Sequence, residues 1–401
     1  MSATMLKLTA RDPIVARDGR PFGAGQGNRM RGVGWPLPSV VAGSFRTALV
    51  KANLDLDFNG GMPQRLMNIE VAGVFPTAGG KLYFPAPNDC VWNGETKQVH
   101  AARPLDPGTG GGDFPSDGSD LRPVVLSETE SPTDFKPRAA PAWWPIGKLT
   151  DWLLGRDVTF DAEFLETAKA ETRDHVHLDA NTGAAAEGEL FTTVGLNATH
   201  LPRFGLPESA PFSERFVEIA LGARVTISEP GFEHVARLDT WHPLGGERRL
   251  VHWQRSETVE GWACPDEIRT QLAATKRVRM VLTTPAIFQH GWRPDWLDAN
   301  TLTGNPNKGS DGPKLKLVGV SSTRWKAVSG WSLAKINATG QLDPKGRPGP
   351  KAIRRMVPAG SVYFFAVEGN GQSLADGWLR SVSDLPQDRN DGFGLAVWGI
   401  W

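Results

Sequence analysis

The sequence has little cysteine and no long apolar run. Only two of its 401 residues are cysteines, Cys90 and Cys264, which lie far apart without metal-ligand spacing. A disulfide framework is therefore excluded, and a reducing cytoplasmic setting is expected. No apolar stretch approaches the roughly 20 residues that cross a bilayer. The segment MSATMLKLTARDP lacks the apolar core of a signal peptide. Neither a membrane protein nor a secreted one is expected.

The motifs of several enzyme classes are also missing. Residues 304–310, GNPNKGS, lack both the spacing and the ending of a P-loop. GAGQGN at 23–28 fails the dinucleotide-binding fingerprint at its last glycine. The sequence contains neither HExxH nor GxSxG. Serine, histidine and aspartate all occur, but no local signature supports serine hydrolysis. A non-catalytic protein without cofactor or metal is therefore predicted.

The net charge of the chain is zero, with 44 basic and 44 acidic residues, but the charges are unevenly distributed. Residues 1–51 hold eight basic side chains against two acidic ones, and residues 308–355 hold eleven against two. Two basic segments in a neutral chain favour a polyanion bound along one face; the alternative is a pair of solvated loops. The expected phosphate contacts in the first segment are Arg17, Arg20, Arg29, Arg31 and Arg46.

The chain is poor in tyrosine, with two, but contains 45 glycines, 31 prolines and 15 tryptophans. Glycine and proline indicate many turns, and an irregular excursion is expected over 86–141. Tryptophans near turns either stack on bases and anchor interfaces or, more often, fill the core.

Hydrophobic periodicity predicts two similar halves. The first reads strand, helix, two strands, helix, strand. Its segments are 5–16, 36–52, 69–75, 81–85, helical signals within 145–170, a strand pair over 175–196, and 215–227. The second half repeats this pattern less clearly from 248 to 401. The predicted fold class is α+β, with tandem ferredoxin-like (RRM-like) domains over 1–228 and 229–401 and long loop insertions.

Three groups of residues are candidates for binding or catalysis. Ser39, Gly43 and Arg46 lie at helical spacing and form a small, cationic face that a phosphate backbone could approach. The glycine-rich segment RNDGFGLAVWG (389–399) leaves Gly392 and Gly394 without side chains beside a terminal strand, so backbone amides are accessible to phosphates; an ordinary β-turn is the alternative.

The third group is His175-x-His177-x-Asp179. On a strand, all three side chains project from one face. Two imidazoles and a carboxylate suit a metal ion, and either histidine suits general acid–base cleavage of RNA. No third strong ligand group is evident beside them, so an RNA-contacting or structural role is favoured over a metal-dependent hydrolase or a nuclease.

Together these segments resemble the RAMP superfamily of CRISPR-associated proteins, and most closely the family of third subunits of Cmr (type III-B) effector complexes. The resemblance rests on motifs that span nearly the whole chain in order: DPIVARDGRPFG, WPLPSVVAGSFRTAL, HVHLDANTGAAAEGELF, HPLGGERRLVHW, RRMVPAGSVYFF and DGFGLAVWG. Many of them are shared with the related Csm-type subunit.

The resemblance implies a cytoplasmic, non-catalytic RNA-binding subunit of an antiviral defence ribonucleoprotein. Such a subunit holds the 5′ tag of the guide RNA (crRNA) and contacts the large polymerase-like subunit and the backbone RAMP subunits. It implies RNA contacts at Arg46, at Gly392, Phe393 and Gly394, and at a protruding hairpin around 179–188 that includes Thr182. The remaining RNA-contact candidates are Arg17, Arg20, Arg29, Arg31, Ser39, Gly43, His175, His177 and Asp179. A repeat-RNA endoribonuclease of the same superfamily is the alternative.

Overall fold

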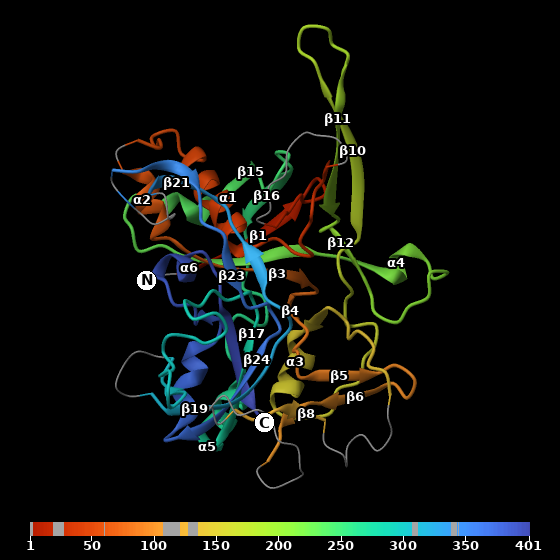
Figure 1. The fold of residues 1–401 in the computed structure, drawn as a ribbon, viewed down its shortest axis with the longest axis vertical. Coiled ribbons are helices and arrows are strands. Elements are labelled where there is room, and N and C mark those ends of the chain that lie inside the picture. Colours follow the sequence, from red (N-terminus) through yellow and green to blue (C-terminus); the bar gives the residue numbers. More distant parts are fainter. Residues whose placement is uncertain are drawn as a thin grey trace.

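The computed structural model describes residues 3–18, 28–59, 61–106, 121–126, 135–306, 312–337, 343 and 345–401, and gives no account of the side chains of residues 28, 29, 187, 188, 333 and 336. It has a mixed α and β architecture in which two antiparallel sheets form the body (Figure 1). The predicted α+β class is confirmed at this level. No helix in the described ranges is long and apolar enough to span a membrane.

The first sheet has seven strands in the order β15-β16-β1-β14-β3-β4-β9. Their bounds are β1 Ala3–Ala10, β3 Glu70–Ala78, β4 Lys81–Pro85, β9 Trp143–Pro145, β14 Ala220–Thr226, β15 Asp239–Pro243 and β16 Leu250–Arg255. Helix α1 (Pro38–Lys51) covers it, beginning with a proline whose fixed φ suits the first helical turn. Val41, Phe45 and Leu49 recur at helical spacing and are fully buried.

The second sheet has six strands in the order β18-β19-β24-β17-β26-β25. Their bounds are β17 Arg277–Leu282, β18 Thr303–Gly304, β19 Lys314–Ser321, β24 Val362–Glu368, β25 Arg380–Ser381 and β26 Leu395–Ile400. Its central strands are nearly continuous apolar runs, as expected where both faces are covered. Helix α5 (Asp266–Ala274) and the 3-10 helix η2 (Gly371–Gly377) pack beside each other and against β26.

The two sheets share one hydrophobic core. Phe75 and Trp144 of the first sheet belong to the same buried cluster as Val278 and Phe364 of the second. Helix α3 (Ile146–Leu153) follows β9 of the first sheet but packs against β26 of the second. Strands β15 and β16 return to the first sheet beside β1. The predicted boundary after residue 228 lies between β14 and β15, which belong to the same sheet.

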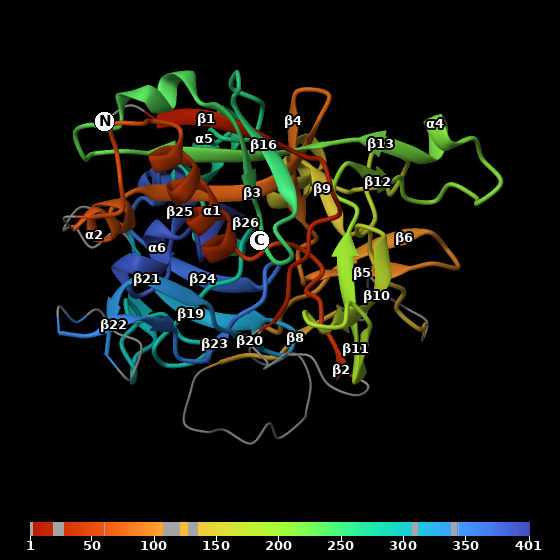
Figure 2. The same ribbon diagram turned by 90° about the horizontal axis from the view of Figure 1, so that it is seen from above.

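Smaller elements decorate this body (Figures 1 and 2). They are β2 Asn28–Arg29, α2 Met62–Met67, β5 Cys90–Asn93, β6 Gln98–Ala101, β7 Arg103–Pro104, β8 Val124–Val125, β10 Ala170–Leu178, β11 Ala185–Leu196, β12 His200–Pro202, α4 Phe212–Arg215, β13 Phe216–Glu218, η1 Glu233–Arg237, β20 Lys326–Val328, β21 Trp331–Ile336, β22 Arg347–Pro350, β23 Arg354–Met356 and α6 Pro386–Asn390.

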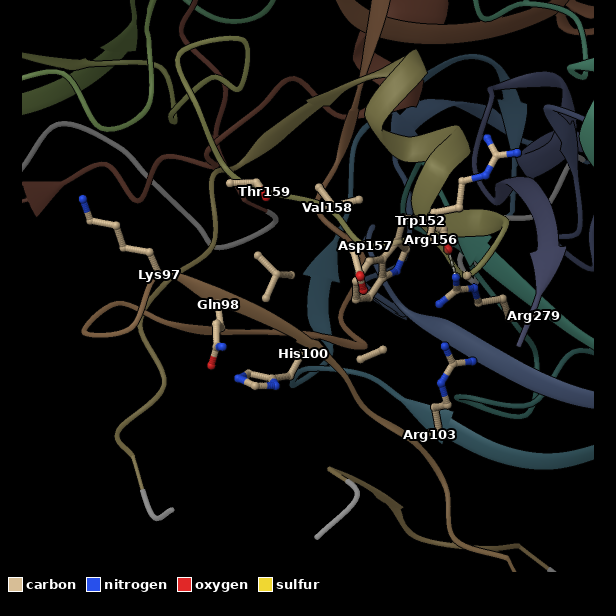
Figure 3. A pocket seen from close by; sticks show the side chains of 13 residues that line it. Lys97, Gln98, His100, Arg103, Trp152, Arg156, Asp157, Val158, Thr159 and Arg279 are labelled. Carbon is tan, nitrogen blue, oxygen red and sulfur yellow. Dashed lines mark hydrogen bonds between the residues drawn. The ribbon is translucent and has the colours of Figure 1, made fainter. Parts of the chain in front are cut away.

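The excursion over 86–141 is not wholly irregular. Strands β5 and β6 form a hairpin that borders a pocket against the end of α3 (Figure 3), and β7 pairs with β8. Other expectations needed adjustment at their ends. The strand expected over 5–16 ends at Ala10.

Candidate nucleic-acid interface

The candidate interface begins at a hairpin that projects from the body (Figure 1). Strands β10 and β11 form it, and β2 joins as a third, parallel strand. In this pairing Asn28 lies opposite Phe191, and Arg29 lies opposite Thr192. The amide of Met30 donates to the carbonyl of Thr192 over 2.9 Å. Two segments that the sequence indicated separately, the N-terminal basic segment and the histidine-rich strand, therefore lie side by side.

The tip of the hairpin is organised by Asp179. Its carboxylate accepts hydrogen bonds from the backbone amides of Asn181 and Thr182, each 2.9 Å long. The pKa of Asp179 is lowered, chiefly by the Thr182 amide and then by the Asn181 amide. Gly183 completes the turn with a φ of 66°. Asp179 and Thr182 therefore shape the turn itself.

The expected alignment of His175, His177 and Asp179 on one strand face is wrong. Strand β10 ends at Leu178, and its pairing with β11 shifts in register between Val176 and Leu178, so Asp179 belongs to the turn. His177 approaches Glu189 at 3.9 Å. Within the ranges that the structure describes, no three histidine, cysteine or acidic side chains are grouped as a metal site.

His175 is held within the hairpin. Its Nε2 lies 2.8 Å from the Thr193 hydroxyl, and its ring stacks on Phe191 with centroids 5.1 Å apart and planes 14° from parallel. Around it the hairpin exposes three apolar side chains, Val176, Leu178 and Leu190. Exposed apolar groups on a projecting ribbon are typical of a surface that contacts a partner or stacked bases.

Two of the predicted arginines lie at the base of this hairpin. Arg17 pairs through its backbone with Gly32, and the amide of Asp18 donates to the carbonyl of Arg31 over 3.1 Å. Both Arg17 and Arg31 are exposed. Arg20 and the side chain of Arg29 lie outside the described residues, although the backbone of Arg29 is part of β2.

Arg46 does not project from helix α1 as expected. It is buried, and its guanidinium pairs with Asp391 at 2.5 Å and donates to the carbonyl of Ile69 over 2.7 Å. It therefore joins α1 to the C-terminal glycine segment rather than presenting a free cation. Ser39 is half-buried, whereas Gly43 is exposed with open space around it. The face of α1 with small side chains is therefore present, but the positive charge predicted for it is buried.

The glycine-rich segment is also buried rather than presented. A Cβ on Gly392 would lie 2.3 Å from the carbonyl oxygen of Val71, and one on Gly394 would lie 2.5 Å from the Ser383 hydroxyl. Phe393 fills a small apolar cluster with Leu37 and its neighbours. The close backbone approach at Gly392 is to strand β3 of the first sheet. The expected exposure to phosphate is wrong for this chain.

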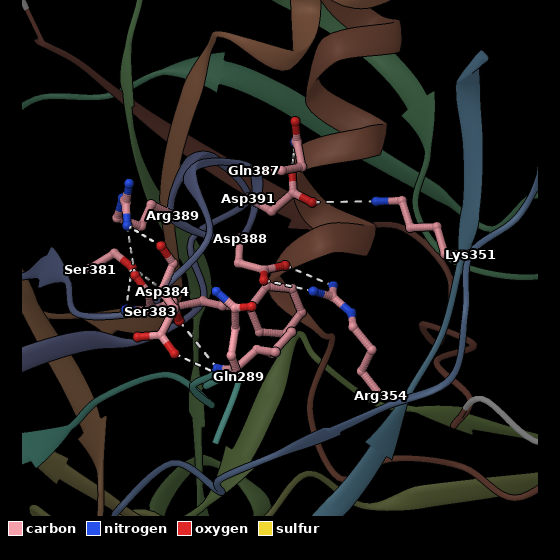
Figure 4. A network of polar contacts seen from close by, with 12 residues as sticks. Gln289, Lys351, Arg354, Ser381, Ser383, Asp384, Gln387, Asp388, Arg389 and Asp391 are labelled. Atoms are coloured by element: carbon pink, nitrogen blue, oxygen red, sulfur yellow. Dashed lines mark hydrogen bonds and ion pairs between the residues drawn. The ribbon is translucent and has the colours of Figure 1, made fainter. Parts of the chain in front are cut away.

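Acidic residues around α6 neutralise part of the second basic segment (Figure 4). Arg354 binds Asp388 through two hydrogen bonds of 2.7 Å each, and Lys351 lies 3.5 Å from Asp391. Both carboxylates are almost completely buried. These cations therefore fasten the segment 351–354 to the body.

A groove between the two sheets continues from the hairpin base. It has a volume of about 230 Å³ and is lined by residues 33–38 of the N-terminal segment, Thr283–Pro285 and Lys326. Trp35 lies at its wall, 4.6 Å from Trp143, and donates to the carbonyl of Val74. The residues that border the groove beyond strand β17 are mostly small or apolar, so sequence patterns alone did not mark it.

Beside the groove, an exposed tryptophan was missed by the sequence analysis. Trp325 precedes strand β20 and is 47% exposed, with the Arg355 guanidinium 4.7 Å from its ring centroid. Lys326, the next residue, lines the groove. The signal available was the basic segment 308–355, in which the sequence analysis singled out no individual residue. An exposed ring carrying an arginine is suited to stacking on a base while its cation meets a phosphate.

The chain has relatives among known protein families and solved structures. The model of the family described as CRISPR-associated protein (Cas_Cmr3) matches residues 6–401. A chain in a type III-B Cmr-beta complex, bound to cognate target RNA and AMPPnP, is 12% identical, with a TM-score of 0.44 and coverage of 93% of this chain and 87% of that one. A chain of a Csm3-Csm4 subcomplex is 11% identical, with a TM-score of 0.33 and coverage of 92% and 94%. No curated protein sequence matches.

Proposed function

Because the chain belongs to the Cas_Cmr3 family of CRISPR-associated proteins, we propose that it is a non-catalytic subunit of a type III-B effector complex that binds the 5′ tag of the guide RNA. The observation that carries this proposal is the pairing of β2 with β11. That pairing brings the exposed Arg17 and Arg31 to the base of the projecting hairpin. The same N-terminal segment then lines the groove between the sheets.

This surface has the properties that single-stranded RNA requires. Arg17 and Arg31 supply cations for phosphates at one end. Trp325 with Arg355 supplies a stacking platform at the other, beside Lys326. The groove between them is apolar enough to receive a base edge. Two of its threonine hydroxyls are already used, since Thr283 donates to the carbonyl of Leu395 and Thr284 donates to the carbonyl of Gly392. None of this requires a general acid or a metal.

We further propose that both sheets are ferredoxin-like units. In the first sheet, β1, β3, β14 and β16 are strands 1 to 4 of the unit in chain order. They lie side by side in the order β16-β1-β14-β3, which is 4-1-3-2. In the second, β17, β19, β24 and β26 stand in the same order. Helix α1 follows the first strand of the first unit. The hairpin β10–β11 and the segment 86–141 are insertions between strands of that unit.

Exposed apolar side chains away from the groove are the proposed contacts with the large polymerase-like subunit and the backbone subunits. Trp331 is 64% exposed and Phe212 is 60% exposed, on different projections of the molecule. Solvated large aromatic groups of this kind are enriched at protein interfaces. Assembly and guide binding are therefore assigned to different parts of the surface.

Replacing both Arg17 and Arg31 with alanine is expected to weaken guide-RNA binding. Two lost phosphate contacts should reduce the slope of log affinity against log salt by about 1.4, at about 0.7 for each contact with a single strand. The measurement is a salt titration of binding to RNA that carries the repeat-derived tag, in the reconstituted complex. A matched variant, Arg237→Ala/Arg380→Ala, removes two exposed charges elsewhere. Equal slopes for both variants and wild type would remove this surface from the proposal.

The alternative, an endoribonuclease acting on repeat RNA, gives an opposite expectation for His175. Because His175 is fixed by Thr193 and stacks on Phe191, we expect it to support the hairpin rather than transfer protons. Incubation of the chain with labelled repeat RNA in metal-free buffer should leave the RNA intact. Site-specific cleavage that disappears in His175→Ala, with His177→Ala as the comparison, would establish the nuclease instead.

A further inference from the structure

A second pocket lies on the excursion that borders helix α3, and it shares no lining residue with the groove. The hairpin β5–β6 forms one wall, and the segment that follows α3 forms another (Figure 3). Its volume is about 430 Å³. That volume falls within the usual range for small-molecule sites, about 300–1,000 Å³, and accommodates one nucleotide.

A buried cation lies at the inner end of this pocket. Arg279 is only 1% exposed, and its Nη1 donates to Asp89 over 2.5 Å. Its Nη2 donates to the carbonyl of Trp152, and the indole ring of that tryptophan lies 5.2 Å from the guanidinium. The remaining donor, Nε, has no hydrogen-bond partner. Asp89 is also shared with the Trp152 indole N–H, so this single carboxylate is the counter-ion of Arg279.

A second guanidinium faces the first across the pocket. Arg103 is half-buried and lines the pocket, and no hydrogen bond or ion pair joins its side chain to any described residue. Figure 3 shows its guanidinium directed toward Arg279. Burial lowers the pKa of Arg279; the Asp89 carboxylate opposes this shift, and the positive charge of Arg103 adds to it. Two like charges are thus held together where an anion would relieve their repulsion.

The other polar lining residues come from both walls of the pocket. Lys97 and His100 come from the β5–β6 hairpin and add donors. Arg156 at the rim is already bound to Asp151 and Glu267, so it contributes little uncompensated charge. Asp157 is the single carboxylate among the lining residues. It offers acceptors for hydroxyl groups rather than for an anion.

We propose that this pocket binds a ribonucleotide, with its phosphate on Arg103 and its ribose hydroxyls toward Asp157. Arg103 provides the fork of N–H donors that matches a phosphate. The nucleotide comes either from solution or from an RNA strand, because the recognised chemistry is the same. This site is independent of the proposed guide-RNA surface, since the two have no residue in common.

The test uses the 401-residue chain in buffer free of phosphate and sulfate. AMP, inorganic phosphate and a short single-stranded RNA are titrated separately by calorimetry, with thermal stabilisation as a second readout. Wild type is expected to bind AMP more tightly than phosphate. In Arg103→Ala the affinity for AMP should fall about 10- to 100-fold, since a charge-assisted contact is lost. Deoxy-AMP should bind more weakly than AMP to wild type, but equally to Asp157→Ala.

The folding of Arg103→Ala provides the control against a structural role. Because the Arg103 side chain bonds to no residue that the structure describes and repels Arg279, its removal should leave the melting temperature of the ligand-free chain unchanged or raised. Arg237→Ala, an exposed arginine outside the pocket, should leave AMP binding unchanged. Binding of the RNA alone, lost in Arg103→Ala, assigns the site to a strand. Absence of binding by all three probes, equal binding of phosphate and AMP, or equal affinity in Arg103→Ala overturns the proposal.

Discussion

Replacing Asp89 with asparagine is expected to lower the free energy of unfolding by about 3–5 kcal/mol, the range for breaking a buried ion pair at one partner. Asp89 is 0% exposed and Arg279 is 1% exposed. Asparagine has nearly the same shape and keeps an acceptor for the Trp152 indole. The lost stability therefore reports on the negative charge of Asp89 alone. A guanidinium that is only 1% exposed would remain without its counter-ion. Denaturant unfolding followed by tryptophan fluorescence measures the difference.

The double variant Asp89→Asn/Arg279→Met separates the two partners. An apolar side chain of similar length removes the stranded charge, so much of the stability lost in Asp89→Asn should return. Glu368→Gln, which breaks the exposed pair with Lys314, is the matched control and should cost far less because water already solvates both groups. A cost for Asp89→Asn no larger than that of the control would show that the buried pair is not a principal stabilising contact.

Local patterns identified those elements whose signals are local. Helix α1 has a proline in its first turn and buried residues at helical spacing, and its predicted span of 36–52 agrees closely with Pro38–Lys51. The strand pair joined by Gly79-Gly80 is likewise observed. The strand pair expected over 175–196 is the hairpin β10–β11, whose turn depends on Asp179 and Gly183. In each case the determining residues lie within a few positions of one another.

The errors concern contacts between distant parts of the chain. Helical spacing predicted the face of α1 from which Arg46 projects. It could not predict that Asp391, 345 residues further along the chain, binds the Arg46 guanidinium. Nothing local in Leu250–Arg255 indicates that this strand pairs with β1 rather than with the strands that follow it. Exposure of the glycine segment was inferred from the missing side chains. The same absence equally permits the tight packing that is observed.

The missing Cβ of Gly392 is required by packing, and Gly392→Ala is expected to destabilise the chain by about 2–5 kcal/mol. The positive φ of 87° costs about 1–2 kcal/mol for any residue with a Cβ. The added methyl would also lie 2.3 Å from the carbonyl oxygen of Val71. Overpacking of this kind typically costs about 1–3 kcal/mol, because a backbone atom cannot rotate away. Strand β3 and the segment after α6 would have to separate.

A second glycine distinguishes the contact from the backbone strain. Gly80 has a φ of 73°, and a Cβ placed there meets nothing within 4 Å. Gly80→Ala therefore has only the cost of the left-handed conformation, and its free energy of unfolding should fall by about 1–2 kcal/mol. Equilibrium unfolding of both variants in denaturant gives the comparison, and the excess in Gly392→Ala measures the contact between the two sheets. Equal losses would mean that Val71 moves aside without cost and that the junction at Gly392 is loosely packed.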